Sequence, residues 1–281
     1  MSYAFVVAAS QNYIQGLTAL LNSIEKWHGD STAVIILSLD LDLDTTPYSF
    51  PITIIDSPVR DMVRGTAIER FRIAYEQAPS YSSICLLDAD MFLTANVGLF
   101  FKIAEAGFIV TGSNGMIINF NRDYQKKYGV DLGVDEYPYP EVHTTAPIFI
   151  SARDTDWFKA LYDSRRIDQW DDFLYLNLLG IKMGKDKKMV TLPPYSCTGI
   201  HHFQLKPATA VFKRGELLLS GTEERVLMVH GKWFDPGWLQ DLMPTMERYL
   251  HDEDIGPKGK QRVEDAIDLL KSEFGKYVSG C

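Results

Sequence analysis

The sequence predicts an α/β protein built on a mostly parallel central sheet flanked by helices. Short apolar segments of strand length alternate with longer segments in which apolar residues recur at helical spacing. Polar residues directly follow several of the predicted strands. A succession of strand, helix and strand at this spacing is typical of a parallel sheet, which binds ligands at the carboxyl ends of its strands.

The N-terminal part of the chain shows this pattern most clearly. Residues 4–9 are predicted as a buried strand, and a polar turn at residues 10–13 follows it. The next helix has one apolar face, formed by Leu17, Leu20, Leu21, Ile24 and Trp27. Two more strands are predicted at residues 33–39 and 52–55. The acidic segment 40–44 between them lacks the glycine and closing glutamate of a calcium loop, so we predict a solvated loop there.

Composition and charge exclude several classes of protein. The chain has 281 residues and a formal net charge of −9, which argues against a general binder of nucleic acid or anionic membranes. Its three cysteines are widely spaced and lack a metal-ligand pattern, which indicates a reducing compartment. No apolar stretch approaches the ~18 residues of a membrane helix, and the N-terminus reads as a strand instead of a signal peptide. We therefore expect a soluble, cytoplasmic protein without a transmembrane segment.

Asp88 and Asp90 are the most informative residues of the chain. They follow an apolar strand that begins at residue 83, and the chain becomes apolar again directly after them. Carboxylates among apolar residues are costly to desolvate unless a positive charge meets them. Oxygen ligands suit Mg²⁺ or Mn²⁺, which also bind phosphate oxygens. The pattern therefore predicts a divalent-metal and diphosphate site at the carboxyl edge of the sheet.

A helix with two arginines precedes this strand. Thr66 and Glu69 form a capping-box pattern, which predicts the start of a helix. Arg70 and Arg72 fall in its first turns, and we expect both to project toward the same sheet edge as Asp88. The helix would therefore place basic residues beside the predicted metal site.

The rest of the chain continues the alternation of short strands and helices. Strands are predicted at residues 108–111, 116–120, 148–150, 190–192 and 226–229. Helices are predicted around Trp157, Phe158 and Leu161 and at residues 170–179 and 238–250. Residues 121–143 are polar, rich in tyrosine and proline, and predicted to be irregular. We predict one domain at residues 1–250, followed by a joint and an amphipathic helix at residues 251–281.

This ordered series of segments resembles the GT-A fold of nucleotide-diphospho-sugar transferases. It is most similar to the retaining family 8 glycosyltransferases, which include glycogenin and bacterial lipopolysaccharide galactosyltransferases. Residues 6–13 resemble the nucleotide-binding opening of that family, and residues 69–73 resemble its arginine-bearing helix. The Leu-Asp-Ala-Asp segment at residues 87–90 is similar to the metal motif, and residues 171–177 to a helix that reaches the donor sugar. Residues 229–232 resemble the late strand that supplies a third metal ligand and a lysine.

The resemblance implies a role for each matched residue. The metal ligands would be Asp88, Asp90 and His230, with Mn²⁺ or Mg²⁺ as the ion. The catalytic residues would be Arg70, Asp172 and Lys232. Contacts to the nucleotide would come from Ala8, Ser10, Asn12, Tyr13 and Ala89. The sugar or acceptor would meet Asp171 and Thr145.

The chain departs from the family pattern at three places. Ser10 and Gln11 stand where the family has two acids before Asn-Tyr. Lys232 lies two residues after His230, a shorter spacing than the family's. The residues from Thr145 to Pro147 replace an Asn-x-Gly turn. These differences concern the donor base, the diphosphate and the acceptor.

The predicted function is metal-assisted transfer of a sugar from a nucleotide-diphosphate donor to an acceptor, with retention of configuration. The resemblance implies a UDP-sugar donor, a glycan, lipid-linked or protein acceptor, and attack on the face from which the diphosphate departs. Two other interpretations stay open. The chain could be a non-catalytic sugar-nucleotide or glycan-binding protein on the same fold. It could also be a phosphatase of the haloacid dehalogenase type, which likewise places Asp-x-Asp after a buried strand.

Several of these residues also have a purely structural interpretation. Asp88 and Asp90 could cap a turn, and His230 could be a core or helix-capping histidine. Acids at a helix start, such as Asp171 and Asp172, commonly cap free N–H groups. His201 and His202 would point to opposite faces of a strand, so they could not both serve one site there.

Overall fold

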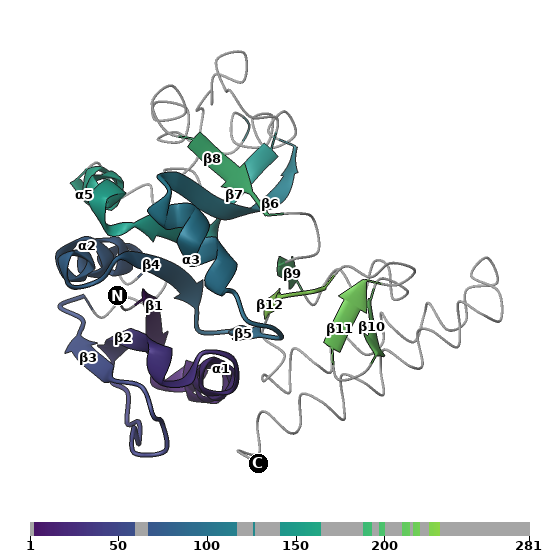
Figure 1. The fold of residues 1–281 in the computed structure, drawn as a ribbon. Coiled ribbons are helices and arrows are strands. Elements are labelled where there is room, and N and C mark those ends of the chain that lie inside the picture. Colours follow the sequence, from purple (N-terminus) through teal and green to yellow (C-terminus); the bar gives the residue numbers. More distant parts are fainter. Residues whose placement is uncertain are drawn as a thin grey trace.

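A seven-stranded sheet lies at the centre of the computed structural model, which describes residues 3–59, 67–116, 126, 141–163, 188–192, 197–199, 210–213, 216–219 and 225–230. The strand order is β3-β2-β1-β4-β7-β6-β8 (Figure 1). The strands are β1 (Tyr3–Ser10), β2 (Thr32–Leu39), β3 (Ile52–Asp56), β4 (Ser83–Asp88), β6 (Phe108–Met116), β7 (Glu141–Ser151) and β8 (Lys188–Thr191). Among them only β7 runs against the others, so the carboxyl ends of β1, β2 and β4 meet at one edge.

Helices cover both faces of this sheet. One face packs against α1 (Ile14–Trp27) and α3 (Gly98–Glu105), and the other against α2 (Ala67–Gln77) and α5 (Asp156–Asp163). Alternate residues of β1 serve the two layers: Phe5 and Val7 face α1 and α3, whereas Ala4 and Val6 face α2 and α5. Strands covered on both faces must be apolar throughout, which is why β2 and β4 read as continuous apolar runs. The predicted α/β class, with a mostly parallel sheet flanked by helices, is confirmed.

A second, smaller sheet adjoins the carboxyl edge of the first. It contains β5 (Met91–Leu93), β12 (Met228–His230) and β9 (Cys197–Gly199), with β12 between the other two. β12 pairs antiparallel with β5 and parallel with β9. A separate hairpin joins β10 (Ala210–Lys213) to β11 (Glu216–Leu219). The chain thus passes from the large sheet to the small one through only two residues, Ala89 and Asp90.

Some predicted elements differ from the observed ones. Residues 108–111 and 116–120 were expected to form two strands. β6 is continuous from Phe108 to Met116, and residues 117–120 lie outside the described residues. The polar residues between the two expected strands pair with β7 through two register shifts, so they continue the ladder instead of forming a turn. β7 begins at Glu141, inside the segment expected to be irregular. The helices predicted at residues 170–179 and 238–250, and the C-terminal segment 251–281, lie outside the described residues.

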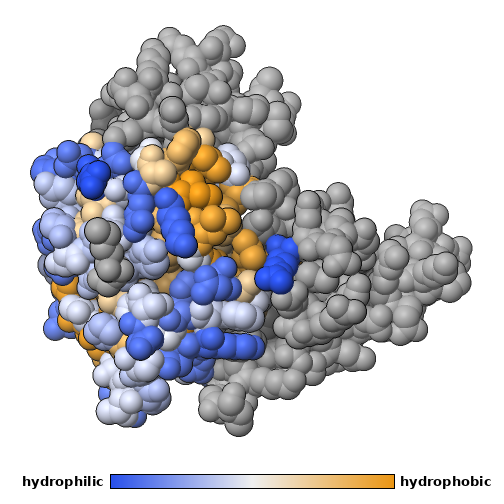
Figure 2. Space-filling view, in the orientation of Figure 1, coloured by the Kyte–Doolittle hydropathy of each residue, from blue (hydrophilic) through white to orange (hydrophobic). Residues whose placement is uncertain are grey.

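Among the described residues, the large hydrophobic side chains that are exposed are Ile54 and Leu99. On the face drawn in Figure 2, hydrophobic residues gather over α3, whose Leu99 is 64 % exposed. Within the part of the chain that the structure describes, no helix is long and apolar enough to cross a membrane.

Candidate metal centre

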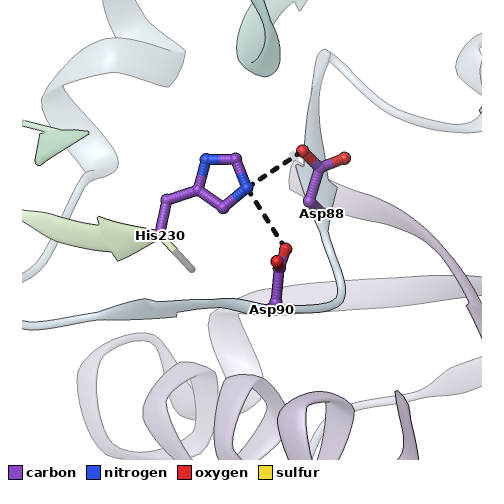
Figure 3. A group of neighbouring side chains, drawn as sticks. All are labelled: Asp88, Asp90 and His230. Carbon is purple, nitrogen blue, oxygen red and sulfur yellow. Dashed lines mark ion pairs between the residues drawn. The ribbon is translucent and has the colours of Figure 1, made fainter. Parts of the chain in front are cut away.

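Three side chains that are distant in sequence converge where the two sheets meet. Asp88 is the last residue of β4, Asp90 follows it in the turn to β5, and His230 ends β12. The His230 Nε2 atom lies 3.4 Å from Asp88 Oδ2 and 3.2 Å from Asp90 Oδ1 (Figure 3). One ligand atom from each residue lies within 4.8 Å of the others, which is close enough for all three to bind one ion.

Backbone pairing explains how the sequence brings these groups together. The apolar run of β4 keeps the chain inside the large sheet until Asp88, where the turn through Ala89 and Asp90 begins. β5 then pairs with β12, and this ladder sets His230 opposite Met91, next to Asp90. The imidazole therefore reaches both carboxylates from the small sheet, while the carboxylates belong to the end of the large one.

Arg70 supplies the positive charge that these carboxylates need. It extends from α2, is only 3 % exposed, and its Nη1 atom forms an ion pair with Asp88 Oδ1. The two oxygens of Asp88 thus have different partners, because Oδ2 is the oxygen near His230. Burial raises the pKa of Asp88, but the charges of Arg70 and His230 outweigh it and hold that pKa below its usual value.

The carboxylates act on His230 in the same way. Burial lowers the pKa of His230, but the hydrogen bond to Asp90 and the charges of both aspartates raise it to about 9. An imidazolium cannot ligate a metal, so metal binding here must release its proton. Two carboxylates and one imidazole form a donor set that suits Mn²⁺, and oxygen-preferring Mg²⁺ less well. The residues present therefore fit a divalent cation.

The predicted nucleotide residues lie along the same edge. Ala8 pairs with Asp88 in the β1–β4 register, and Ala89 is buried between the two acids. Ser10 ends β1 and is 6 % exposed, yet its hydroxyl has no hydrogen-bond partner among the described residues. Asn12 and Tyr13 belong to a 3₁₀ turn (Gln11–Tyr13) that leads into α1. A buried, unpaired hydroxyl at a sheet edge is a group that a ligand could satisfy.

The acidic loop after β2 holds this turn in place, a contact that the sequence analysis missed. The Gln11 N–H donates to Asp40 Oδ1 at 3.2 Å, and the Asp42 N–H donates to Gln11 Oε1 at 2.9 Å. Asp40 has a φ of 90°, a backbone conformation that aspartate tolerates better than most residues. The loop was predicted only as solvated, because a contact between two turns leaves no local signal in the sequence.

Other predicted residues lie elsewhere or outside the described residues. Arg72 was expected beside Arg70, but its guanidinium pairs with Glu69 and Glu76 on its own helix. Thr145 lies in β7, three residues before the partner of Leu86, so its backbone is on the Asp88 side of the sheet. The described part of the chain does not include Asp171, Asp172, His201, His202 and Lys232.

Solved structures of the galactosyltransferase LgtC share this fold. One is LgtC in complex with donor and acceptor sugar analogues, which is 15 % identical to this chain with a TM-score of 0.54. That match covers 87 % of this chain and 94 % of LgtC. An active-site mutant of LgtC is 14 % identical, also with a TM-score of 0.54, over 86 % of this chain and 95 % of that one. No protein-family model and no curated protein sequence matches the chain. The chain therefore has the GT-A fold, and the resemblance found in the sequence is confirmed at the level of the fold.

Proposed function

We propose that this chain is a metal-dependent glycosyltransferase that moves a sugar from a nucleotide-diphosphate donor to an acceptor. The observation that carries the proposal is the cluster of Asp88, Asp90 and His230 at the carboxyl edge of a GT-A sheet. Both LgtC structures of this fold are galactosyltransferases, and one holds donor and acceptor sugar analogues. The proposed catalytic domain spans residues 1–250, with residues 251–281 as a C-terminal joint and helix.

The donor would lie along the edge that joins β1 to the cluster. Ala8, Ser10, Asn12, Tyr13 and Ala89 would hold the nucleotide, and the unpaired Ser10 hydroxyl supports a polar contact there. The donor is proposed as a UDP-sugar. Arg70 already places a buried positive charge beside Asp88, and Lys232 would add a second to the diphosphate. The sugar and the acceptor, a glycan, lipid-linked or protein hydroxyl, would lie near Asp171, Asp172 and Thr145.

The charges of this site suit the departure of a diphosphate. As the glycosidic bond breaks, negative charge grows on the leaving nucleoside diphosphate. A bound Mn²⁺ or Mg²⁺ ion would supply Lewis-acid stabilisation of that charge. Arg70 and Lys232 would add fixed positive charge that needs no reorganisation during the reaction. The acceptor hydroxyl is proposed to attack on the face that the diphosphate leaves and to pass its proton to a diphosphate oxygen, which retains the configuration.

Replacing Asp90 with alanine tests this function directly. Because Asp90 is proposed as a metal ligand, Asp90→Ala should lower both sugar transfer and donor hydrolysis by about 100-fold or more. The measurement is release of nucleoside diphosphate from nucleotide sugars with and without Mn²⁺. Asp30→Ala removes an exposed acid before β2, at the opposite end of the sheet, and should leave the rate unchanged.

The same assay separates the alternatives. Unchanged turnover in a folded Asp90→Ala protein would contradict the proposal. Tight donor binding by the unaltered protein, without Mn²⁺-dependent consumption, would favour a binding protein on the same fold. A haloacid dehalogenase phosphatase has its Asp-x-Asp after the first strand, whereas here Asp88 ends β4 of a GT-A sheet. That interpretation therefore loses its structural basis.

A further inference from the structure

We propose that Thr94 is a positioning residue, which holds the strand of His230 in register with Asp88 and Asp90, and that Ser23 assists it from α1. This inference rests on the proposed metal-dependent function. It adds two buried hydroxyl groups that touch neither the metal nor the donor and that no sequence motif marks.

The ladder that places His230 is short. β5 and β12 have three residues each, and they pair as Leu93 with Met228, Phe92 with Val229 and Met91 with His230. A pair of strands of this length has few hydrogen bonds, so contacts beyond its end decide whether it stays in register. Asp88, in contrast, is the last residue of β4 and is fixed in the large sheet.

Thr94 extends this pairing by two further hydrogen bonds. Its backbone N–H donates to the Leu227 carbonyl oxygen at 2.9 Å. Its Oγ1–H donates to the Val226 carbonyl oxygen at 2.6 Å. Both Thr94 and Val226 are buried, at 8 % and 1 % exposure, so water cannot easily replace the hydroxyl. The side chain of Thr94 therefore fixes the chain two residues before β12 begins.

Ser23 anchors the other side of β5. It is fully buried in α1, and its Oγ accepts the Leu93 N–H at 2.9 Å. The same hydroxyl donates to the Leu20 carbonyl oxygen at 2.7 Å, which fixes its orientation. Leu93, the last residue of β5, is thus tied to α1, and the next residue, Thr94, is tied to the segment before β12. This relay connects the helix under the large sheet to the strand that ends in His230.

Loss of the relay should move His230 relative to Asp88, which belongs to the large sheet. The imidazole reaches the carboxylates from β12 alone, at 3.2 and 3.4 Å, so a small shift of that strand changes both distances. Groups that orient metal ligands commonly change metal affinity about 10- to 100-fold when they are removed. Thr94→Val keeps the shape of the side chain but leaves the buried Val226 carbonyl without its partner.

The test compares Mn²⁺ affinity across a matched set of variants. Thr94→Val should weaken Mn²⁺ binding by about 10-fold or more, measured by the electron paramagnetic resonance of free Mn²⁺ during titration at fixed pH. Thr94→Ser keeps the hydroxyl and should restore most of the affinity. Thr32→Val is the control, because the Thr32 hydroxyl also is buried and donates to a carbonyl, that of Tyr3 at 3.2 Å, at the far end of the sheet. It should bind Mn²⁺ as the unaltered protein does.

Hydrogen exchange supplies a readout that needs no metal. Amides of residues 225–230 should exchange faster in Thr94→Val than in Thr32→Val. Wild-type Mn²⁺ affinity together with unchanged exchange in Thr94→Val would overturn the positioning role. A different result would be that the unaltered protein binds no Mn²⁺ while Thr94→Val still exchanges faster. That result would overturn the proposed metal-dependent function but support the role of Thr94 in anchoring the strand. If Thr94→Val does not fold, the same measurements are made on Ser23→Ala. This variant should show smaller losses of Mn²⁺ affinity and of amide protection at residues 225–230.

Discussion

At the scale of single residues, His28 has an unusual environment for a titratable group. It follows α1, is 9 % exposed, and its ring meets Phe5 and Phe101 edge to face. Its Nε2 atom accepts the Val97 N–H at 3.3 Å, so the folded state stabilises the neutral form of the ring. Burial lowers the pKa of His28 from 6.5 to about 4.

This lowered pKa makes the free energy of unfolding depend on pH. Above pH 6.5 the ring is neutral in both states, and its contribution to stability is fully present. As the pH falls from about 6.5 to about 4, the unfolded state binds the proton first, so stability is lost over that range. We expect His28 to account for a loss of about 2 kcal/mol between pH 7 and pH 5. His28→Gln keeps an acceptor for Val97 but cannot titrate, so its urea-unfolding free energy should fall less over the same range. Equal losses in both proteins would contradict this account.

The residues of the site could be predicted to different extents. Asp88 and Asp90 stand out because acids directly follow an apolar strand, and the structure indeed joins them to His230. The expectation for Arg72 was wrong for a geometric reason. Positions two apart on a helix are about 200° apart around its axis, so Arg70 and Arg72 cannot both face the sheet edge. The partner of Arg72 is therefore its own helix.

At the scale of elements, strength of the local pattern decided what could be predicted. Strands covered on both faces and the amphipathic α1 have long apolar signals, and their observed bounds lie close to the predicted ones. In the small sheet, β12 overlaps the strand predicted at residues 226–229, but β5 and β9 were not predicted, because strands of three residues have no measurable periodicity. The pairing in this sheet joins Met91 to His230, so only the folded chain reveals it. α3 was not predicted either, since the apolar Leu99 lies on the same exposed face as Lys102 and Glu105 and interrupts the polar pattern.

One buried carboxylate takes part in the contact between α2 and α5. Glu69 is 4 % exposed, and its Oε1 atom accepts the Tyr162 hydroxyl at 2.9 Å while Oε2 accepts the Arg72 Nε–H at 2.7 Å. Tyr162→Phe should lower the free energy of unfolding by about 1.5–3 kcal/mol, because it removes a hydrogen bond to a charged, buried group. Denaturant unfolding measures this loss. Tyr81→Phe is the control, since the Tyr81 hydroxyl has no hydrogen-bond partner among the described residues. If Tyr81→Phe lowered the free energy of unfolding by a similar amount, the role of Glu69 would be contradicted.

At the scale of the whole molecule, the proposed site joins two sheets, and β5 and β12 of the small sheet share a hydrophobic core with α1 and the large sheet. β4 leads into β5 within two residues, and β12 returns from a distant part of the chain to complete the cluster. A ligand that binds this junction contacts both sheets at once and binds only the folded state. Metal and donor should therefore stabilise the fold as a whole, and not only the loops that contact them.

Thermal unfolding with paired ligands measures this linkage. A nucleoside diphosphate at about 100 times its dissociation constant, with Mn²⁺, should raise Tm by roughly 5–10 °C, which corresponds to about 2.7 kcal/mol. Because Asp88, Asp90 and His230 would hold the ion between protein and diphosphate, the combined shift should exceed the sum of the shifts from Mn²⁺ and nucleotide alone. Asp90→Ala should abolish this excess and retain the smaller shift from nucleotide alone. Testing UDP, GDP and ADP in parallel identifies the base that binds at the sheet edge near Ser10. If the Tm shifts from Mn²⁺ and nucleotide are purely additive with all three, a shared metal–diphosphate site is contradicted.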